Sequence, residues 1–203
     1  MKLTWYGHAC FKLETADGSV VFDPYQPGDV PGLTLPPLSA DAVICSHGHS
    51  DHNAAEAVTL SGKAPTYALT QIPCFHDEEG GKLRGTNLIS IIESEGLRVV
   101  HMGDIGHPLS EEQFKALGQV DVMMIPVGGF FTVTGTQAAE IVKKSGAKAV
   151  IPMHFRGADF GYEVIGPVDE FLSQFPSCTF TGSASLELTP ETEGVIVLNF
   201  RKQ

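Results

Sequence analysis

The feature that most constrains how this chain can fold is the segment His47-Gly48-His49-Ser50-Asp51-His52, which follows the apolar run 42–45 after one residue. Three of the eight histidines lie in it, together with one carboxylate. Imidazole and carboxylate suit zinc and similar divalent metals. A strand that ends in such a loop can present several ligands at one point, whereas a helix would spread them around its circumference. We therefore predict a buried strand carrying a metal-binding loop, in preference to a polar surface loop.

The spacing H-x-H-x-D-H resembles the signature of the metallo-β-lactamase superfamily. Four further residues match that family in the right order: Asp23 after an early apolar run, His76 after the motif, Asp104 in a Gly-Asp step and His154 after a late apolar run. The opening WYGH (5–8) and the segment PVGG (126–129) look closest to a branch of short predicted metal-dependent hydrolases related to ascorbate-phosphate lactonase. The resemblance implies a single α/β domain over residues 1–203, a four-layer αβ/βα sandwich.

The resemblance also implies a ligand set for two divalent metal ions. The first ion would be bound by three histidines and the second by one aspartate and two histidines, with a further aspartate bridging the two. These sets are His47, His49 and His76, then Asp51, His52 and His154, with Asp104 as the bridge. Asp51 is also expected to be catalytic, by orienting the hydroxide that the two metals share. Zinc is favoured, with manganese or iron as alternatives, because geometry and availability decide the metal as much as ligand type does.

Three other residues are expected close to the ligands. Asp23 is expected to hold the HGHSDH loop by hydrogen bonds, a support that metal ligands commonly receive. His101 follows an apolar run near Asp104 and has the same expected role, and the branch resemblance suggests that His8 borders the pocket. Each of these histidines could instead be a capping, strand-end or surface residue.

Substrate contacts are expected from residues near the last metal ligand. Arg156 lies two residues after His154, and a guanidinium group suits carboxylate and phosphate. Phe130 and Phe131 follow two glycines and are expected to line the pocket. The alternatives are an ion pair between Arg156 and a nearby carboxylate, and packing of both phenylalanines beneath the next helix.

Composition limits the partners of the chain. Its 203 residues are enough for one well-buried core. The 24 acidic residues outnumber the 13 basic ones, which gives a net charge of −11 and argues against nucleic acid as a partner. There is neither a long apolar span nor a basic amphipathic stretch, so no membrane partner is expected.

The start lacks a secretory signal, which predicts a cytoplasmic protein and weakens the case for a secreted antibiotic-degrading enzyme. No feature fixes the oligomeric state.

The four cysteines, Cys10, Cys45, Cys74 and Cys178, are far apart in sequence and form no C-x-x-C pair. They lie among apolar residues and are predicted to be buried free thiols. Cys45 and Cys74 lie close to predicted ligands, so a metal-binding role for them is an alternative.

Apolar patterning predicts a β-rich chain with interspersed helices. Strands are expected at 2–5, 11–15, 20–23, 42–45, 66–69, 87–93, 98–101, 122–126, 149–153, 185–188 and 195–200. Helices are expected at 54–60, 111–117, 135–144 and 168–175. Asn53, Ser110 and Thr134 are the expected N-caps of the first three helices, and Gly146 is expected to end the third. The Pro- and Gly-rich segment 24–39 is expected to form a loop that walls the active site.

Together these features predict a dinuclear metal-dependent hydrolase with a small-molecule substrate. A metal-bound hydroxide would attack an ester, lactone or phosphodiester bond in a small anionic metabolite. An iron-dependent oxygenase and a nuclease of the same fold are alternatives, although a nuclease would need a basic arm that the sequence lacks. A non-catalytic metal-binding protein is the third alternative.

Overall fold

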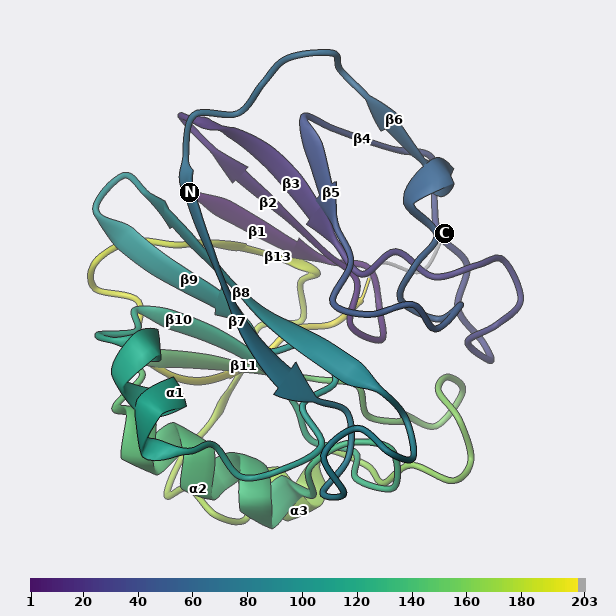
Figure 1. The fold of residues 1–203 in the computed structure, drawn as a ribbon, viewed down its shortest axis with the longest axis vertical. Coiled ribbons are helices and arrows are strands. Elements are labelled where there is room, and N and C mark those ends of the chain that lie inside the picture. Colours follow the sequence, from purple (N-terminus) through teal and green to yellow (C-terminus); the bar gives the residue numbers. More distant parts are fainter. Residues whose placement is uncertain (201–203) are drawn as a thin grey trace.

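The computed structural model describes residues 1–200, which form two main β-sheets with α-helices outside one of them (Figure 1). The first sheet has five strands in the order β13 (Ser185–Glu187), β1 (Lys2–Trp5), β2 (Phe11–Thr15), β3 (Gly18–Phe22) and β5 (Ala42–Ile44). The second has seven, in the order β12 (Thr179–Phe180), β14 (Gly194–Val197), β11 (Ala149–Met153), β10 (Val122–Pro126), β9 (Leu97–His101), β8 (Thr86–Ser94) and β7 (Ala68–Phe75). One hydrophobic cluster includes residues of both sheets. The predicted α/β sandwich class is confirmed.

The helices lie together on the side of the seven-stranded sheet that faces away from the other sheet (Figure 1). They are α1 (Glu111–Leu117), α2 (Gly135–Ser145) and α3 (Asp169–Leu172). Every residue of β10 and β11 is buried, as expected for parallel strands that are covered on both faces. This pattern explains why both strands read as continuous apolar runs in the sequence.

Three helix ends follow the predicted chemistry closely. Ser110 and Thr134 each form a capping box, in which the hydroxyl accepts a backbone hydrogen bond and a glutamine three residues later caps in return. Gly146 ends α2 in the left-handed region, with φ of 67°. These three predictions are confirmed because short-range hydrogen bonding alone decides them.

The predicted helix at 54–60 is wrong. Residues Ala55–Ala57 form a single 3₁₀ turn without a side-chain cap, so Asn53 is not an N-cap. The next residues form β6 (Val58–Leu60), which pairs in parallel with β4 (Leu38–Ala40), a strand that the sequence analysis assigned to a loop. Tertiary pairing therefore overrides the local preference here.

Two other elements differ in length from the prediction by four residues each. The strand expected at 66–69 is the eight-residue β7, which continues through Pro73. Proline is tolerated there because β7 lies at the edge of its sheet and needs no donor on its outer side. The helix expected at 168–175 is reduced to α3, with turns leading to Pro176. Among residues 1–200, no helix is long and apolar enough to cross a bilayer.

Candidate metal centre

The predicted metal ligands all follow the carboxyl ends of strands that run in one direction within their sheets. β3 and β5 are parallel, and they lead into Asp23 and into the HGHSDH loop. In the other sheet β9, β10 and β11 are parallel, while β7 is antiparallel to β8, which is itself antiparallel to β9. β7, β9 and β11 therefore present His76, Asp104 and His154 at one edge. This common edge is where parallel strands usually build a site.

Backbone strain is concentrated at this edge. His8, Asp23 and His154 have φ values of 51°, 42° and 52°, in the left-handed region that non-glycine residues rarely adopt. Each such conformation costs of order 1–3 kcal/mol and persists only where the surroundings hold it. Two donors hold the backbone of His8, since its carbonyl oxygen accepts hydrogen bonds from Trp5 Nε1 at 3.0 Å and from His154 N at 3.2 Å.

Three histidines meet at the carboxylate of Asp104. The Nε2 atoms of His52 and His154 lie 3.1 Å from Asp104 Oδ2, and that of His76 lies 3.4 Å away. Burial alone would raise the pKa of Asp104, but nearby positive charge on His154 and His52 lowers it well below its ordinary value. The bridging position predicted for Asp104 coincides with this meeting point.

The predicted ligands of the first metal form one cluster. His47, His49 and His76 each offer a nitrogen, and the three nitrogens lie within 4.8 Å of one another. Burial, followed by the charge of His52, lowers the pKa of His47 to about 4. The imidazole of His47 is therefore neutral at physiological pH, which is the form that binds a metal.

The predicted ligands of the second metal also come together, with one addition. Asp51, His52 and His154 form a group with His8, and the four ligand atoms lie within 4.8 Å of one another. His8 Nε2 forms a 3.2 Å hydrogen bond with Asp51 Oδ2, and its ring centroid lies 4.0 Å from that of His154. His8 was expected at the border of the pocket, and it lies inside the cluster.

Asp23 lies in the position expected of a supporting residue. It accepts hydrogen bonds from Ser46 N at 2.7 Å, from Ser46 Oγ at 2.6 Å and from His52 Nδ1 at 2.8 Å. Both of its oxygens are thereby used within the protein. Because Nδ1 of His52 donates to Asp23, Nε2 is left facing Asp104.

His101 supports the site indirectly, through Gly103. Its Nε2 donates to Ala9 O at 2.9 Å and its Nδ1 accepts from Gly103 N at 3.2 Å, while its ring stacks on Phe22. Burial lowers the pKa of His101, so the ring is neutral and can use one nitrogen as a donor and the other as an acceptor. It fixes the residue that precedes Asp104.

Asn87 is a supporting residue that the sequence analysis missed. This fully buried side chain on β8 accepts from Asp104 N at 2.9 Å and donates to Met102 O at 2.9 Å. Gly103 lies against it with φ of 56°, and a Cβ there would come within 2.3 Å of Asn87 Oδ1. A lone asparagine within an apolar strand was the available signal.

The metal cluster opens into a cavity of about 420 Å³. It is lined by His49, Ser50, Asp51, His76, Arg84, Asp104, Phe131 and Tyr162. Phe131 is in the expected place, while Phe130 lines the neighbouring cavity instead. Arg84 and Tyr162 were not anticipated, because no local pattern marks them.

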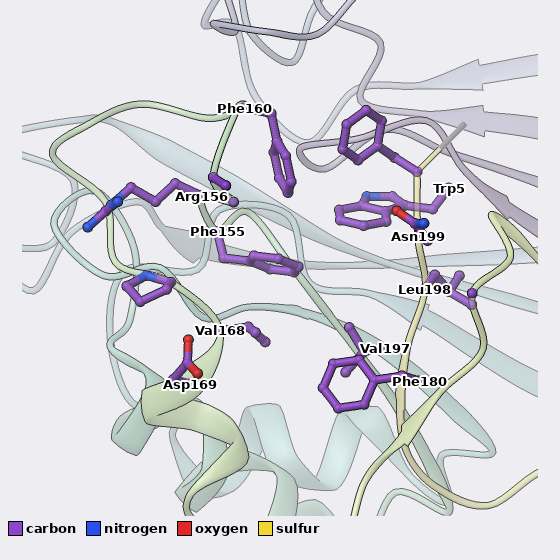
Figure 2. A pocket seen from close by; sticks show the side chains of 15 residues that line it. Trp5, Phe155, Arg156, Phe160, Val168, Asp169, Phe180, Val197, Leu198 and Asn199 are labelled. Carbon is purple, nitrogen blue, oxygen red and sulfur yellow. The ribbon is translucent and has the colours of Figure 1, made fainter. Parts of the chain in front are cut away.

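The structure does not place Arg156 in this cavity. It lines a different one of about 490 Å³, together with aromatic residues such as Trp5, Phe155 and Phe160 (Figure 2). Its backbone N donates to Gly166 O and its Nε to Ile165 O at 2.8 Å, which hold the side chain along the segment 165–166. The guanidinium in Figure 2 points away from the aromatic residues. Proximity in sequence to His154 did not bring Arg156 to the metal cluster, because its backbone N and its Nε are hydrogen-bonded to Gly166 O and Ile165 O.

The segment 24–39 supports the metal loop from outside the cavity. Gln26 N donates to Ser50 O, and Pro24 O accepts from Ala54 N. No residue of this segment lines the 420 Å³ cavity, so the segment does not form the expected wall of the site. It supports the metal loop instead.

The cysteines are free thiols, as predicted. Cys10 and Cys74 are buried, whereas Cys45 and Cys178 are only half-buried. Within residues 1–200, none of them joins a cluster of candidate metal ligands.

Comparison with known proteins gives a consistent family. The model of a beta-lactamase superfamily domain matches residues 2–154. A UPF0173 metal-dependent hydrolase from Methanoregula boonei is 32% identical over 191 residues, covering 76% of this chain and 82% of that protein. Another UPF0173 metal-dependent hydrolase, from Archaeoglobus fulgidus, is 29% identical, and the match covers 76% of this chain and 83% of that protein. The crystal structure of a proposed Zn-dependent hydrolase of the metallo-beta-lactamase superfamily from Thermotoga maritima is 33% identical, covers 97% of each chain and superposes with a TM-score of 0.79.

Proposed function

The chain belongs to the beta-lactamase superfamily, among its metal-dependent hydrolases, and from this premise we propose a dinuclear enzyme that cleaves an ester, lactone or phosphodiester bond in a small anionic metabolite. The family supplies the metal-dependent hydrolase activity. The number of metals, the bond and the substrate are our proposal.

One observation carries the two-metal reading. Asp104 Oδ1 and His47 Nε2 are buried and make no hydrogen bond within residues 1–200. His52 Nε2 and His154 Nε2 are also buried, and they face the Asp104 carboxylate at 3.1 Å without hydrogen-bond geometry. Leaving a buried polar atom unpaired costs about 1–3 kcal/mol. Such atoms gathered at one point fit cations as their missing partners, and imidazole with carboxylate is the donor set that zinc favours. Manganese and iron also accept these donors.

The donors divide naturally between two ions. His47, His49 and His76 would hold one, and Asp51, His52 and His154 would hold the other. Asp104 has one oxygen among the imidazoles and a second that makes no hydrogen bond within residues 1–200, so this carboxylate would be shared between the two ions. Bound there, two divalent cations would lower the pKa of a water molecule and polarise the bond under attack.

The hydrolysis balances without a serine or cysteine nucleophile. The water oxygen forms a bond to the acyl carbon or phosphorus, the bond from that centre to the leaving oxygen breaks, and the proton of water ends on the leaving oxygen. Asp51 lines the cavity and can accept a hydrogen bond from the attacking water. His8 Nε2 and Tyr162 OH both donate to its Oδ2, at 3.2 and 3.3 Å, and so fix its orientation.

The cavity argues for a small substrate over a nucleic acid. Its volume of about 420 Å³ is near the lower end of ligand pockets. The net charge of −11 repels a polyanion at long range. An oxygenase of this fold would keep the same ligands, and a non-catalytic metal-binding protein would leave the cavity without a reaction.

Metal analysis coupled to a substrate panel tests the proposal. Protein purified without chelator should contain about two metals per chain and hydrolyse a member of a panel of esters, lactones and phosphodiesters. Asp104→Ala should lose both metals, His76→Ala mainly the first and His154→Ala mainly the second. One metal per chain after incubation with zinc, manganese or iron would overturn the dinuclear reading. Two metals with no hydrolysis, and oxygen uptake instead, would favour the oxygenase.

A further inference from the structure

Besides the candidate ligands and Ser50 of the metal loop, three side chains line the cavity beside the metal cluster. Arg84, Phe131 and Tyr162 line it, and they come from three separate loops. Arg84 is the single arginine or lysine among the lining residues of this cavity. A charged group in that position needs either a protein partner or a ligand.

The part of the chain that the structure describes offers Arg84 no such partner. Within residues 1–200 its guanidinium group makes no hydrogen bond and no ion pair, and its recorded contact is with the ring of Phe131, at 5.7 Å from Cζ to the centroid. The contrast with Arg98 is clear, because Arg98 pairs with Glu93 at 2.8 Å. In a chain with 24 acidic residues, a half-buried guanidinium without a carboxylate is available for a ligand.

The loop that carries Arg84 is built against a metal ligand. Asp77, which directly follows His76, accepts backbone hydrogen bonds from Glu79, Gly81, Leu83 and Arg84 at 2.7 to 3.0 Å. The next residue, Gly85, accepts at its carbonyl oxygen from His76 N at 3.0 Å. The backbone of Arg84 is therefore fixed relative to the candidate metal ligand, which is the preorganisation that recognition requires.

The other two residues connect the guanidinium to the reacting end. The rings of Phe131 and Tyr162 meet edge to face with centroids 6.0 Å apart. The Tyr162 hydroxyl donates to Asp51 at 3.3 Å. Three successive contacts thus connect Arg84 through Phe131 and Tyr162 to the carboxylate proposed to orient the attacking water. Because all of these residues line one cavity of about 420 Å³, the arrangement suits a compact ligand.

We propose that Arg84 recognises a carboxylate on the substrate, and that the substrate is a compact ester or lactone whose acid group lies a few bonds from the scissile bond. A single guanidinium balances one negative charge, and its planar fork matches a carboxylate. The flat face of Phe131 then packs against the substrate between its two ends. This inference rests on the proposed hydrolase function.

Binding of a matched pair of probes tests the inference independently of turnover. The probes are N-(4-nitrophenyl)glutaramic acid and N-(4-nitrophenyl)pentanamide, which have the same length and differ in one carboxylate. Calorimetry on the zinc-loaded protein should show that the acid binds about 10- to 100-fold more tightly than the neutral amide. Arg84→Gln should abolish that preference and Arg84→Lys should retain part of it, with metal content unchanged in both.

Two controls separate this effect from general charge and from the other arginine near the site. Lys82→Gln removes the same charge from the same loop, but Lys82 does not line the cavity, so the preference should survive. Arg156→Gln tests the residue that the sequence favoured. Survival of the preference in Arg84→Gln, its loss in Arg156→Gln alone, or its absence in the wild type would each overturn the inference.

Kinetics then distinguish this inference from the hydrolase proposal. With 4-nitrophenyl hydrogen glutarate and 4-nitrophenyl pentanoate, Arg84→Gln should raise KM about 10- to 100-fold for the acid and little for the neutral ester. If the esters are hydrolysed but Arg84→Gln changes KM equally for the acid and the neutral ester, Arg84 does not recognise a carboxylate, although the hydrolase function stands. If the acid binds more tightly through Arg84 but neither these esters nor the wider panel are hydrolysed, the carboxylate-recognition site stands and the hydrolase proposal is wrong.

Discussion

At the scale of single residues, the site depends on buried polar groups that hold one another in place. Asp104 has its backbone fixed by Asn87, and Gly103 before it is fixed by His101. His52 is fixed by Asp23. Such supporting hydrogen bonds decide whether ligands are aimed before the metal arrives.

Replacing Asn87 with leucine tests this support. Asn87→Leu leaves Asp104 N and Met102 O unpaired in the interior, which should lower the free energy of unfolding by about 2–5 kcal/mol. It should also weaken metal binding by about 10–100-fold. Urea titration and zinc competition measure the two effects. Ser90→Ala on the same strand removes only the hydroxyl that accepts a hydrogen bond from the exposed Gln71, so it should be mild by both measures. Full metal affinity in Asn87→Leu would contradict the supporting role.

His8 gives the metal-free protein a defined pH dependence. Burial, with a smaller contribution from the charge of His154, lowers its pKa from 6.5 to about 3. Below pH 6.5 His8 therefore binds a proton in the unfolded chain but not in the folded protein, so the free energy of unfolding decreases as the pH falls. One residue contributes at most about 1.4 kcal/mol per pH unit. Between pH 4.5 and 6.5, in chelator, His8→Gln should show a shallower loss of unfolding free energy, with the remaining slope due partly to His47. Parallel slopes for variant and wild type would refute this assignment.

At the scale of elements, the loop 76–85 shows how one side chain can organise a segment. Four backbone N–H groups of this loop donate hydrogen bonds to the Asp77 carboxylate. Burial alone would raise the pKa of Asp77, but these hydrogen bonds outweigh burial and lower the pKa. Three glycines with positive φ, at positions 80, 81 and 85, let the backbone curl around the carboxylate.

Removing that carboxylate should loosen the loop without unfolding the sheet. In Asp77→Ala, amide hydrogens of residues 79–84 should exchange at least about tenfold faster by mass spectrometry, because each loses a charge-assisted hydrogen bond or a neighbour that has one. Glu78→Ala is the matched control, since that side chain accepts only from Gln137 within the described residues. Equal exchange in both variants would show that the loop is held by other contacts.

At the scale of the whole molecule, the metal centre joins the two sheets. Asp23, the HGHSDH loop and His8 come from the five-stranded sheet, while His76, Asp104 and His154 come from the seven-stranded one. A cation bound between them would cross-link the sheets in the folded state alone. Metal binding should therefore be visible as global stability.

Metal removal should lower the unfolding temperature reversibly. Ligand present at 100 times its dissociation constant stabilises the folded state by about 2.7 kcal/mol. Thermal unfolding after chelation should shift downward and should recover on addition of zinc, whereas Asp104→Ala should respond little to either treatment. An unchanged wild-type transition would mean that the cluster does not bind metal in the folded protein.

The sequence by itself determined the features that rest on short-range chemistry. The HGHSDH spacing, the capping boxes at Ser110 and Thr134 and the apolar strands β10 and β11 are all local, because neighbouring residues alone decide them. The family resemblance further predicted the distant residues His76, Asp104 and His154, which the structure brings together.

Only the tertiary structure decided which other side chains surround these residues. Arg84 and Tyr162 carry no pattern in the sequence, and Asn87 carries only that of a lone asparagine in an apolar strand. They reach the site because β7, β8 and the loop 155–166 end beside it. Arg156 is close to His154 in sequence but lines another cavity, since a hydrogen bond from its Nε to Ile165 O holds its side chain there. The helix expected at 54–60 failed for the same reason, as pairing with β4 lies outside any local window. Contacts between distant segments depend on how the whole chain packs, and local residue preferences do not record that packing.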